Sequence, residues 1–152
     1  MDEKAFKEGI LAGLEYSYRH DEWVNPLDEA LDGLSAANAL WRPGDEAKGI
    51  WDIVLHLAVW NENIVERMKT GEKARPEEGA WPPIPDPADD AAWEASKKRL
   101  WDSLQNLEQY LSTCAPGRLM AGPYGLGDLL CRFVHNGYHL GQITKLREIK
   151  GF

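Results

Sequence analysis

The chain has 152 residues, 43% of them hydrophobic and 28% charged, a balance that suits one globular domain over residues 1–152. Its net charge of −8 and the lack of any lysine or arginine run argue against a nucleic-acid partner and against binding to an anionic membrane. No signal peptide or bilayer-spanning apolar run is recognisable, and two cysteines cannot build a disulfide framework, so we expect a cytoplasmic protein with free thiols.

Two long helices are predicted in the first half of the chain. The first begins after Asp2, a suitable N-cap residue, and runs to about Arg19. The second covers about residues 48–70 and ends at Gly71, because glycine readily adopts the left-handed conformation that follows many helices. The segment 25–28 between them is expected to start a short helix.

Two more long helices are predicted in the second half. The third opens at Asp86 and Pro87, with acidic residues in its first turn, and has a buried leucine stripe at positions 100, 104, 107 and 111. The fourth runs from about Gly127 to Lys150. Between the second and third, residues 72–85 carry four prolines around Trp81 and are expected to form an ordered, non-helical loop. Since no strand pattern is recognisable, the sequence predicts an all-α four-helix bundle; its long connections leave the topology open.

Three histidines form the most informative pattern. His135 and His139 are four residues apart and therefore lie on the same side of the last helix. His56 sits in an apolar run of the second helix and is expected to face the core. Because neighbouring bundle helices are about 8–10 Å apart, all three imidazoles can reach one metal ion. Zinc, nickel and iron all accept such a ligand set.

Other interpretations of these residues stay open. His56 would also be satisfied by a carbonyl, with the paired histidines at a hydrated helix edge. Cys131 offers a second ligand set with the pair on one helix, although a free cysteine is more often a small buried hydrophobe. Asp52, Asp128 and Gln142 are candidates to orient a ligand, and both carboxylates are more commonly solvated or capping groups. His20 is expected at the surface.

The residue between the paired histidines limits the chemistry. Position 136 is asparagine, whereas the His-Glu-x-x-His pattern of zinc proteases places its general base there. We therefore predict no catalytic residue beyond the metal ligands, so that a bound water or thiol must supply the reactivity. Trp60, Tyr138 and Gln142 lie within a turn of the ligands and are the candidates for a substrate pocket. For each aromatic side chain, packing in the core is the alternative.

The chain resembles the DinB-like (DinB/YfiT) superfamily of helical-bundle metalloproteins in three segments that follow one another in the family's order. These are residues 31–35 with 41–43, the helix segment 49–60, and the segment 135–143. The resemblance implies a four-helix bundle of up-down-down-up topology, often a homodimer, with a divalent metal held by His56, His135 and His139.

Three functions are compatible with that resemblance and with the residues. The first is a metalloenzyme acting on a small-molecule substrate as a thiol-dependent S-transferase or isomerase, since relatives use mycothiol, bacillithiol or glutathione. The second is a non-catalytic, metal-stabilised protein linked to stress. The third is a metal-dependent hydrolase, in which metal-bound water replaces the thiol.

Overall fold

The computed structural model describes residues 2–21, 25–87, 89–121 and 124–152. Within these ranges it contains helices and no strand, which confirms the all-α class. None of the described helices is long and apolar enough to cross a bilayer. Seven helices are present in the described residues: α1 (Glu3–Tyr16), α2 (Leu27–Leu31), α3 (Ala36–Leu40), α4 (Ile50–Thr70), α5 (Asp90–Thr113), α6 (Pro116–Ala121) and α7 (Leu126–Lys150).

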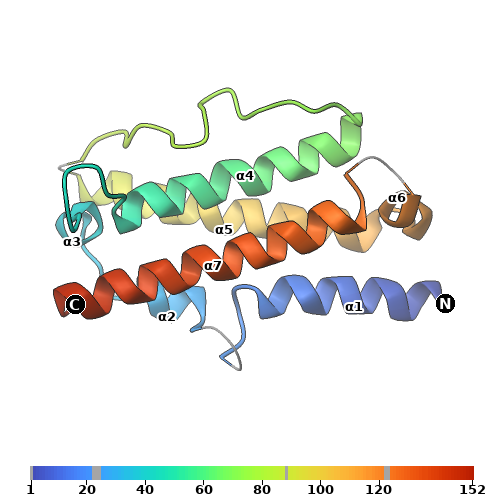
Figure 1. Ribbon diagram of the computed structural model, residues 1–152, viewed down its shortest axis with the longest axis horizontal. Coiled ribbons are helices and arrows are strands. Elements are labelled where there is room, and N and C mark those ends of the chain that lie inside the picture. Colours follow the sequence, from blue (N-terminus) through green and yellow to red (C-terminus); the bar gives the residue numbers. More distant parts are fainter. Residues whose placement is uncertain (1, 22–24, 88, 122–123) are drawn as a thin grey trace.

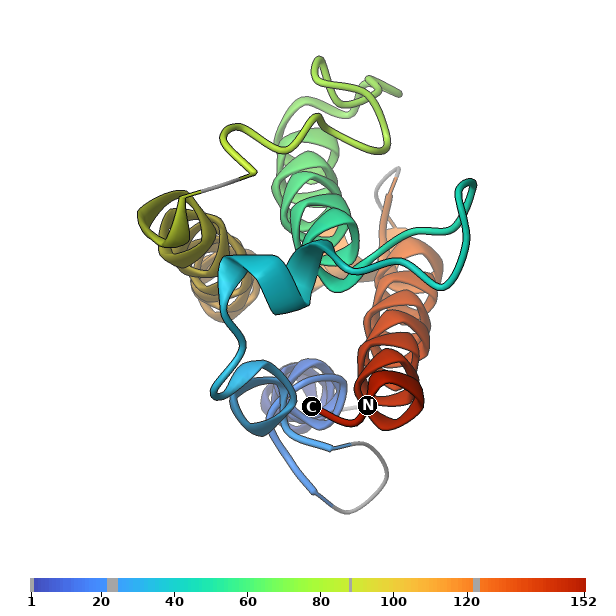
Figure 2. The ribbon, with the colours of Figure 1, turned by 90° about the vertical axis from the view of Figure 1, so that its left-hand side faces the viewer.

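The four long helices, α1, α4, α5 and α7, lie side by side around a shared core (Figures 1 and 2). α4 packs between α5 and α7 and contacts both. Chain direction follows the colours of Figure 1: α1 and α7 run one way, and α4 and α5 run the other. The leucine stripe of α5 is buried as predicted, since Leu100, Leu104, Leu107 and Leu111 are each at most 1% exposed.

Capping groups account for several of the helix ends. Asp2 accepts a hydrogen bond from the Lys4 amide at 3.0 Å, as expected for the N-cap of α1. Gly71 and Gly151 end α4 and α7 with φ angles of 77°, a left-handed conformation that glycine adopts at little cost.

Some predicted boundaries were wrong. α1 ends at Tyr16 rather than near Arg19, because the chain continues only as a turn after it. α5 begins at Asp90 rather than at Asp86, because the Asp89 carboxylate caps it by accepting from the Ala91 amide at 2.8 Å. α3 and α6 were not predicted, since helices of five and six residues are too short to show a periodic pattern.

The start of α4 is fixed by polar contacts, which sets the position of His56 along the bundle. The Asp52 carboxylate accepts the Gly49 N–H at 2.8 Å and also forms two hydrogen bonds with the Arg42 guanidinium, at 2.8 and 2.9 Å. Asp52 is therefore a capping, ion-paired carboxylate, and its hydrogen bonds do not go to a histidine.

Gly49 is closely surrounded by backbone, so we expect alanine there to destabilise the fold. An added Cβ would lie 2.7 Å from the Trp41 carbonyl oxygen and 3.0 Å from that of Ala39. Relieving this overlap should cost about 1–3 kcal/mol, visible as a lower midpoint of urea unfolding. Gly9→Ala is the control, since its Cβ meets nothing within 4 Å, and it should stabilise α1 by about 0.5–1 kcal/mol. Equal midpoints for the two variants would contradict this interpretation.

Candidate metal centre

His56 is held inside the bundle by α4 and by the loop that follows it. Its side chain is 6% exposed, and its Nδ1 lies 2.6 Å from the carbonyl oxygen of Ala80. Because a carbonyl only accepts, Nδ1 carries the hydrogen and Nε2 keeps a free lone pair. Trp81 stacks on the imidazole, with ring centroids 3.9 Å apart. The proline-rich loop, non-helical as predicted, thus both orients His56 and covers it.

His139 is oriented in the same manner from α7. It is 5% exposed, and its Nδ1 lies 2.6 Å from Oε1 of Gln142, the residue one turn further along the helix. This contact leaves Nε2 of His139 as an acceptor. Gln142 in turn donates from its Nε2 to the Tyr138 hydroxyl at 3.0 Å. The short chain from Tyr138 through Gln142 fixes the ring, which is the usual arrangement behind a metal-binding histidine.

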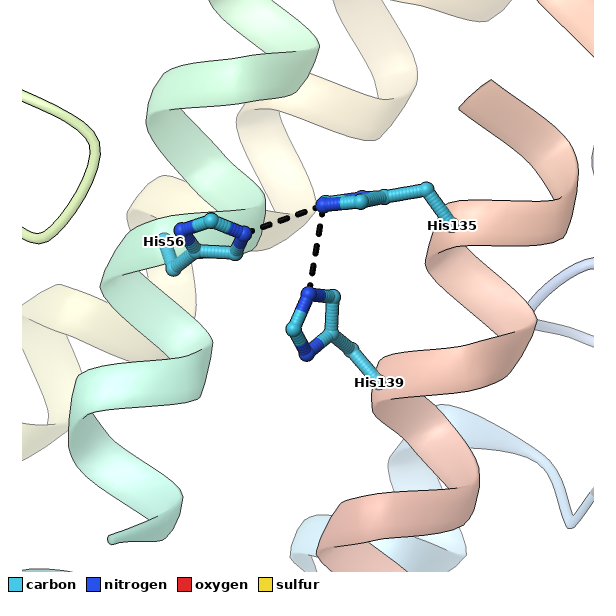
Figure 3. A group of neighbouring side chains, drawn as sticks. All are labelled: His56, His135 and His139. Atoms are coloured by element: carbon cyan, nitrogen blue, oxygen red, sulfur yellow. Dashed lines mark hydrogen bonds between the residues drawn. The ribbon is translucent and has the colours of Figure 1, made fainter. Parts of the chain in front are cut away.

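The three Nε2 atoms point toward one another, as Figure 3 shows. Nε2 of His135 lies 3.0 Å from Nε2 of His56 and 3.2 Å from Nε2 of His139. Three nitrogens bound tetrahedrally to one zinc ion at about 2.0–2.1 Å would be about 3.3 Å apart. Two of the three nitrogen pairs are thus close to that spacing, and the group could hold a metal ion.

Burial keeps these imidazoles neutral. It lowers the pKa of His56 to about 4, opposed in part by the hydrogen bond to Ala80. Burial also lowers the pKa of His135 to about 3, and the positive charge of Arg132 adds to that effect. Burial lowers the pKa of His139 as well. At neutral pH the three imidazoles are thus uncharged, and the uncharged imidazole is the form that binds metal.

The other candidate ligands lie outside the cluster. Cys131 is exposed and does not belong to the group of converging ligand atoms, and Asp128 is also exposed. His20 is at the surface, 3.6 Å from Glu15. Asn136 is 3% exposed, and neither polar atom of its amide has a hydrogen-bond partner among the described residues. The converging set in the described chain is therefore the three histidines alone.

A groove of about 510 Å³ opens beside His139. Two of the three predicted pocket residues, Tyr138 and Gln142, line it together with Trp81. Trp60 does not line this groove; its ring lies 6.3 Å from that of His56. Among the described residues, the lining contains no carboxylate and two lysines: Pro43, Ala47, Lys48, Ile53, Trp81, Tyr138, His139, Gln142, Lys145 and Leu146.

Two groups at the site were missed by the sequence reasoning. The Ala80 carbonyl orients His56, but a backbone acceptor in a loop leaves no signal in the residue type. Arg132 places NH1 3.0 Å from Nδ1 of His135. Arg132 precedes His135 by three residues and therefore lies on the same helix face, so this contact could have been expected from the sequence spacing.

The fold and the cluster together define an all-helical protein with a histidine group suited to a divalent metal. A sequence model of the DinB superfamily matches residues 22–143, which is more than half of the chain. The chain therefore belongs to the DinB superfamily. Comparisons with curated proteins and with solved structures gave no match.

Proposed function

We propose that the chain binds one zinc, nickel or iron ion through Nε2 of His56, His135 and His139, and that this site serves a thiol-dependent transfer or isomerisation. The observation that carries the proposal is the convergence of three imidazoles, two of them buried and that of His135 partly buried, whose ligand nitrogens all lie within 4.8 Å of one another. The directions of the four long helices support the family's up-down-down-up bundle, in which α4 and α7 are antiparallel neighbours. A homodimer is part of the proposal. It is supported by two apolar side chains that α7 leaves exposed, Leu130 and Val134. Light scattering would test it.

A metal ion held by three imidazoles keeps open positions, where it lowers the pKa of a bound thiol or water. The chain's own residues then bind and orient the reactants. The apolar wall of the groove suits the body of a small molecule, and Lys48 and Lys145 favour an anionic group on it. Low-molecular-weight thiols such as glutathione carry carboxylates and fit this charge pattern. The absence of a carboxylate base from the cluster is consistent with a reactant that is activated by the metal.

The test combines metal loading with a thiol screen. We expect protein purified without chelator to carry about one transition-metal ion per chain and to melt at a lower temperature once a chelator removes it. Metal-loaded protein is then incubated with glutathione or bacillithiol and an epoxide, and loss of free thiol is followed over time. Turnover that depends on both metal and thiol would support the proposal.

Other results of the same screen favour other functions. Turnover without added thiol would indicate a hydrolase. Strong stabilisation by metal with no turnover of any electrophile would indicate a non-catalytic protein. Absence of transition metal, together with no effect of His56→Ala on melting in added zinc, would contradict the metal site itself.

A further inference from the structure

Arg132 is a cation placed behind the histidine cluster. Among the residues that the structure describes, its enclosed Nε has no hydrogen-bond partner and no carboxylate pairs with its guanidinium. Its guanidinium lies 5.4 Å from the centroid of the Trp60 ring, and that of Arg67 lies 5.5 Å from the same centroid. Each guanidinium is attracted to the indole ring, but the two positive charges repel each other, and burial together with that repulsion lowers the pKa of Arg132 to about 10.

The hydrogen bond from Arg132 determines which ring nitrogen of His135 carries the hydrogen. A guanidinium only donates, so Nδ1 of His135, 3.0 Å from NH1, is the acceptor. The hydrogen of neutral His135 is therefore on Nε2, where it can be donated to Nε2 of His56 or of His139. These two rings have the opposite arrangement, because their Nδ1 atoms donate to oxygen. One donor thus lies between two acceptors, and the three rings hold one another together without metal.

We propose that the hydrogen bond from Arg132 to His135 and the binding of a divalent cation exclude one another. This inference rests on the proposed function, since it concerns the affinity of the same site. A metal needs the lone pair of Nε2, so the hydrogen of His135 must move to Nδ1. That nitrogen becomes available only when Arg132 turns away, and no proton is released overall. Arg132 is a positioning residue that stabilises the metal-free cluster and weakens metal binding, whereas the usual partner behind a ligand histidine is an acceptor.

Arg132→Gln tests this directly, because a glutamine can accept from Nδ1–H as Gln142 does at His139. We expect the affinity for Zn²⁺ or Co²⁺, measured by competition with a chromogenic chelator, to rise about tenfold or more over the unmodified protein. Arg132→Met, which removes the donor and offers no acceptor, should give a smaller rise. Arg67→Gln is the matched control. It removes the other guanidinium beside Trp60, whose Nε donates to the Ala74 carbonyl and not to a histidine, and it should change the metal affinity little.

A second measurement reads the hydrogen positions without metal. In ¹⁵N-histidine NMR spectra of chelator-treated protein, we expect His135 to be protonated on Nε2, and Arg132→Gln to shift that hydrogen to Nδ1. These spectra and the circular dichroism of each variant also establish that the variants fold. If the unmodified protein binds metal and folded Arg132→Gln binds no more tightly, the inference is overturned and the metal site stands. If neither binds metal, the proposed function fails, and the inference about affinity fails with it.

Discussion

His135→Gln should lower the affinity for Zn²⁺ by about 100-fold, the largest single effect we expect at the cluster. Nε2 of His135 is the central atom, within 3.2 Å of both other ligand nitrogens. Zinc bound by four protein ligands contributes about 10–16 kcal/mol, so one ligand accounts for about 3 kcal/mol, which is about two orders of magnitude in affinity. Isothermal titration at pH 7.5 measures the change, and the melting temperature in excess zinc provides a second reading.

The control is His20→Gln, at a histidine that is exposed and outside the cluster. It removes one imidazole from the surface and should leave zinc affinity as it was. Equal affinities for His135→Gln, His20→Gln and the unmodified protein would place zinc elsewhere on the chain. An equal loss for both variants would point to a non-specific effect of losing a histidine.

The positions of the four long helices along the chain were predictable from the sequence because several independent signals agreed, whereas their topology was not. Asp2, Gly71 and Gly151 mark helix ends through capping chemistry that is local to each residue. The leucine stripe of α5 is periodic over about three turns and is buried as that period predicts. The start of α5 was missed because Asp86 and Asp89 are equally good caps in sequence, and three-dimensional contacts decide between them. Asp90, for example, accepts from the Ala36 amide at 2.7 Å, a contact with α3 that no local pattern contains.

The cluster was predictable as far as helix geometry determines it. The spacing of His135 and His139 and the apolar surroundings of His56 were enough to expect convergence, and the structure brings the three together. What orients them was only partly predictable. Gln142 lies one turn from His139, so its role follows from spacing. The Ala80 carbonyl and the Trp81 stack depend on how a proline-rich loop folds back, which long-range packing decides.

The second large effect we expect is loss of stability when the metal-free protein is acidified. In the unfolded chain a histidine takes up a proton near pH 6.5. In the folded chain burial lowers the pKa of His56 to about 4 and that of His135 to about 3, and lowers the pKa of His139 as well. Between the folded and the unfolded pKa values, the unfolded state binds more protons than the folded state. The free energy of unfolding must therefore fall as the pH falls through this range.

The slope of that decline reports the number of protons. Each proton of difference corresponds to about 1.4 kcal/mol per pH unit, so two to three buried histidines should give about 3–4 kcal/mol per unit near pH 5.5. Urea unfolding in the presence of chelator, at steps from pH 7 to pH 5, measures the slope while most carboxylates stay ionised. His135→Gln should reduce this slope by about 1.4 kcal/mol per pH unit, the equivalent of one proton, whatever the variant does to stability at pH 7. A flat profile, or an unchanged slope in His135→Gln, would mean that these imidazoles are not buried and neutral in the folded protein, and would weaken the case for a preformed metal centre.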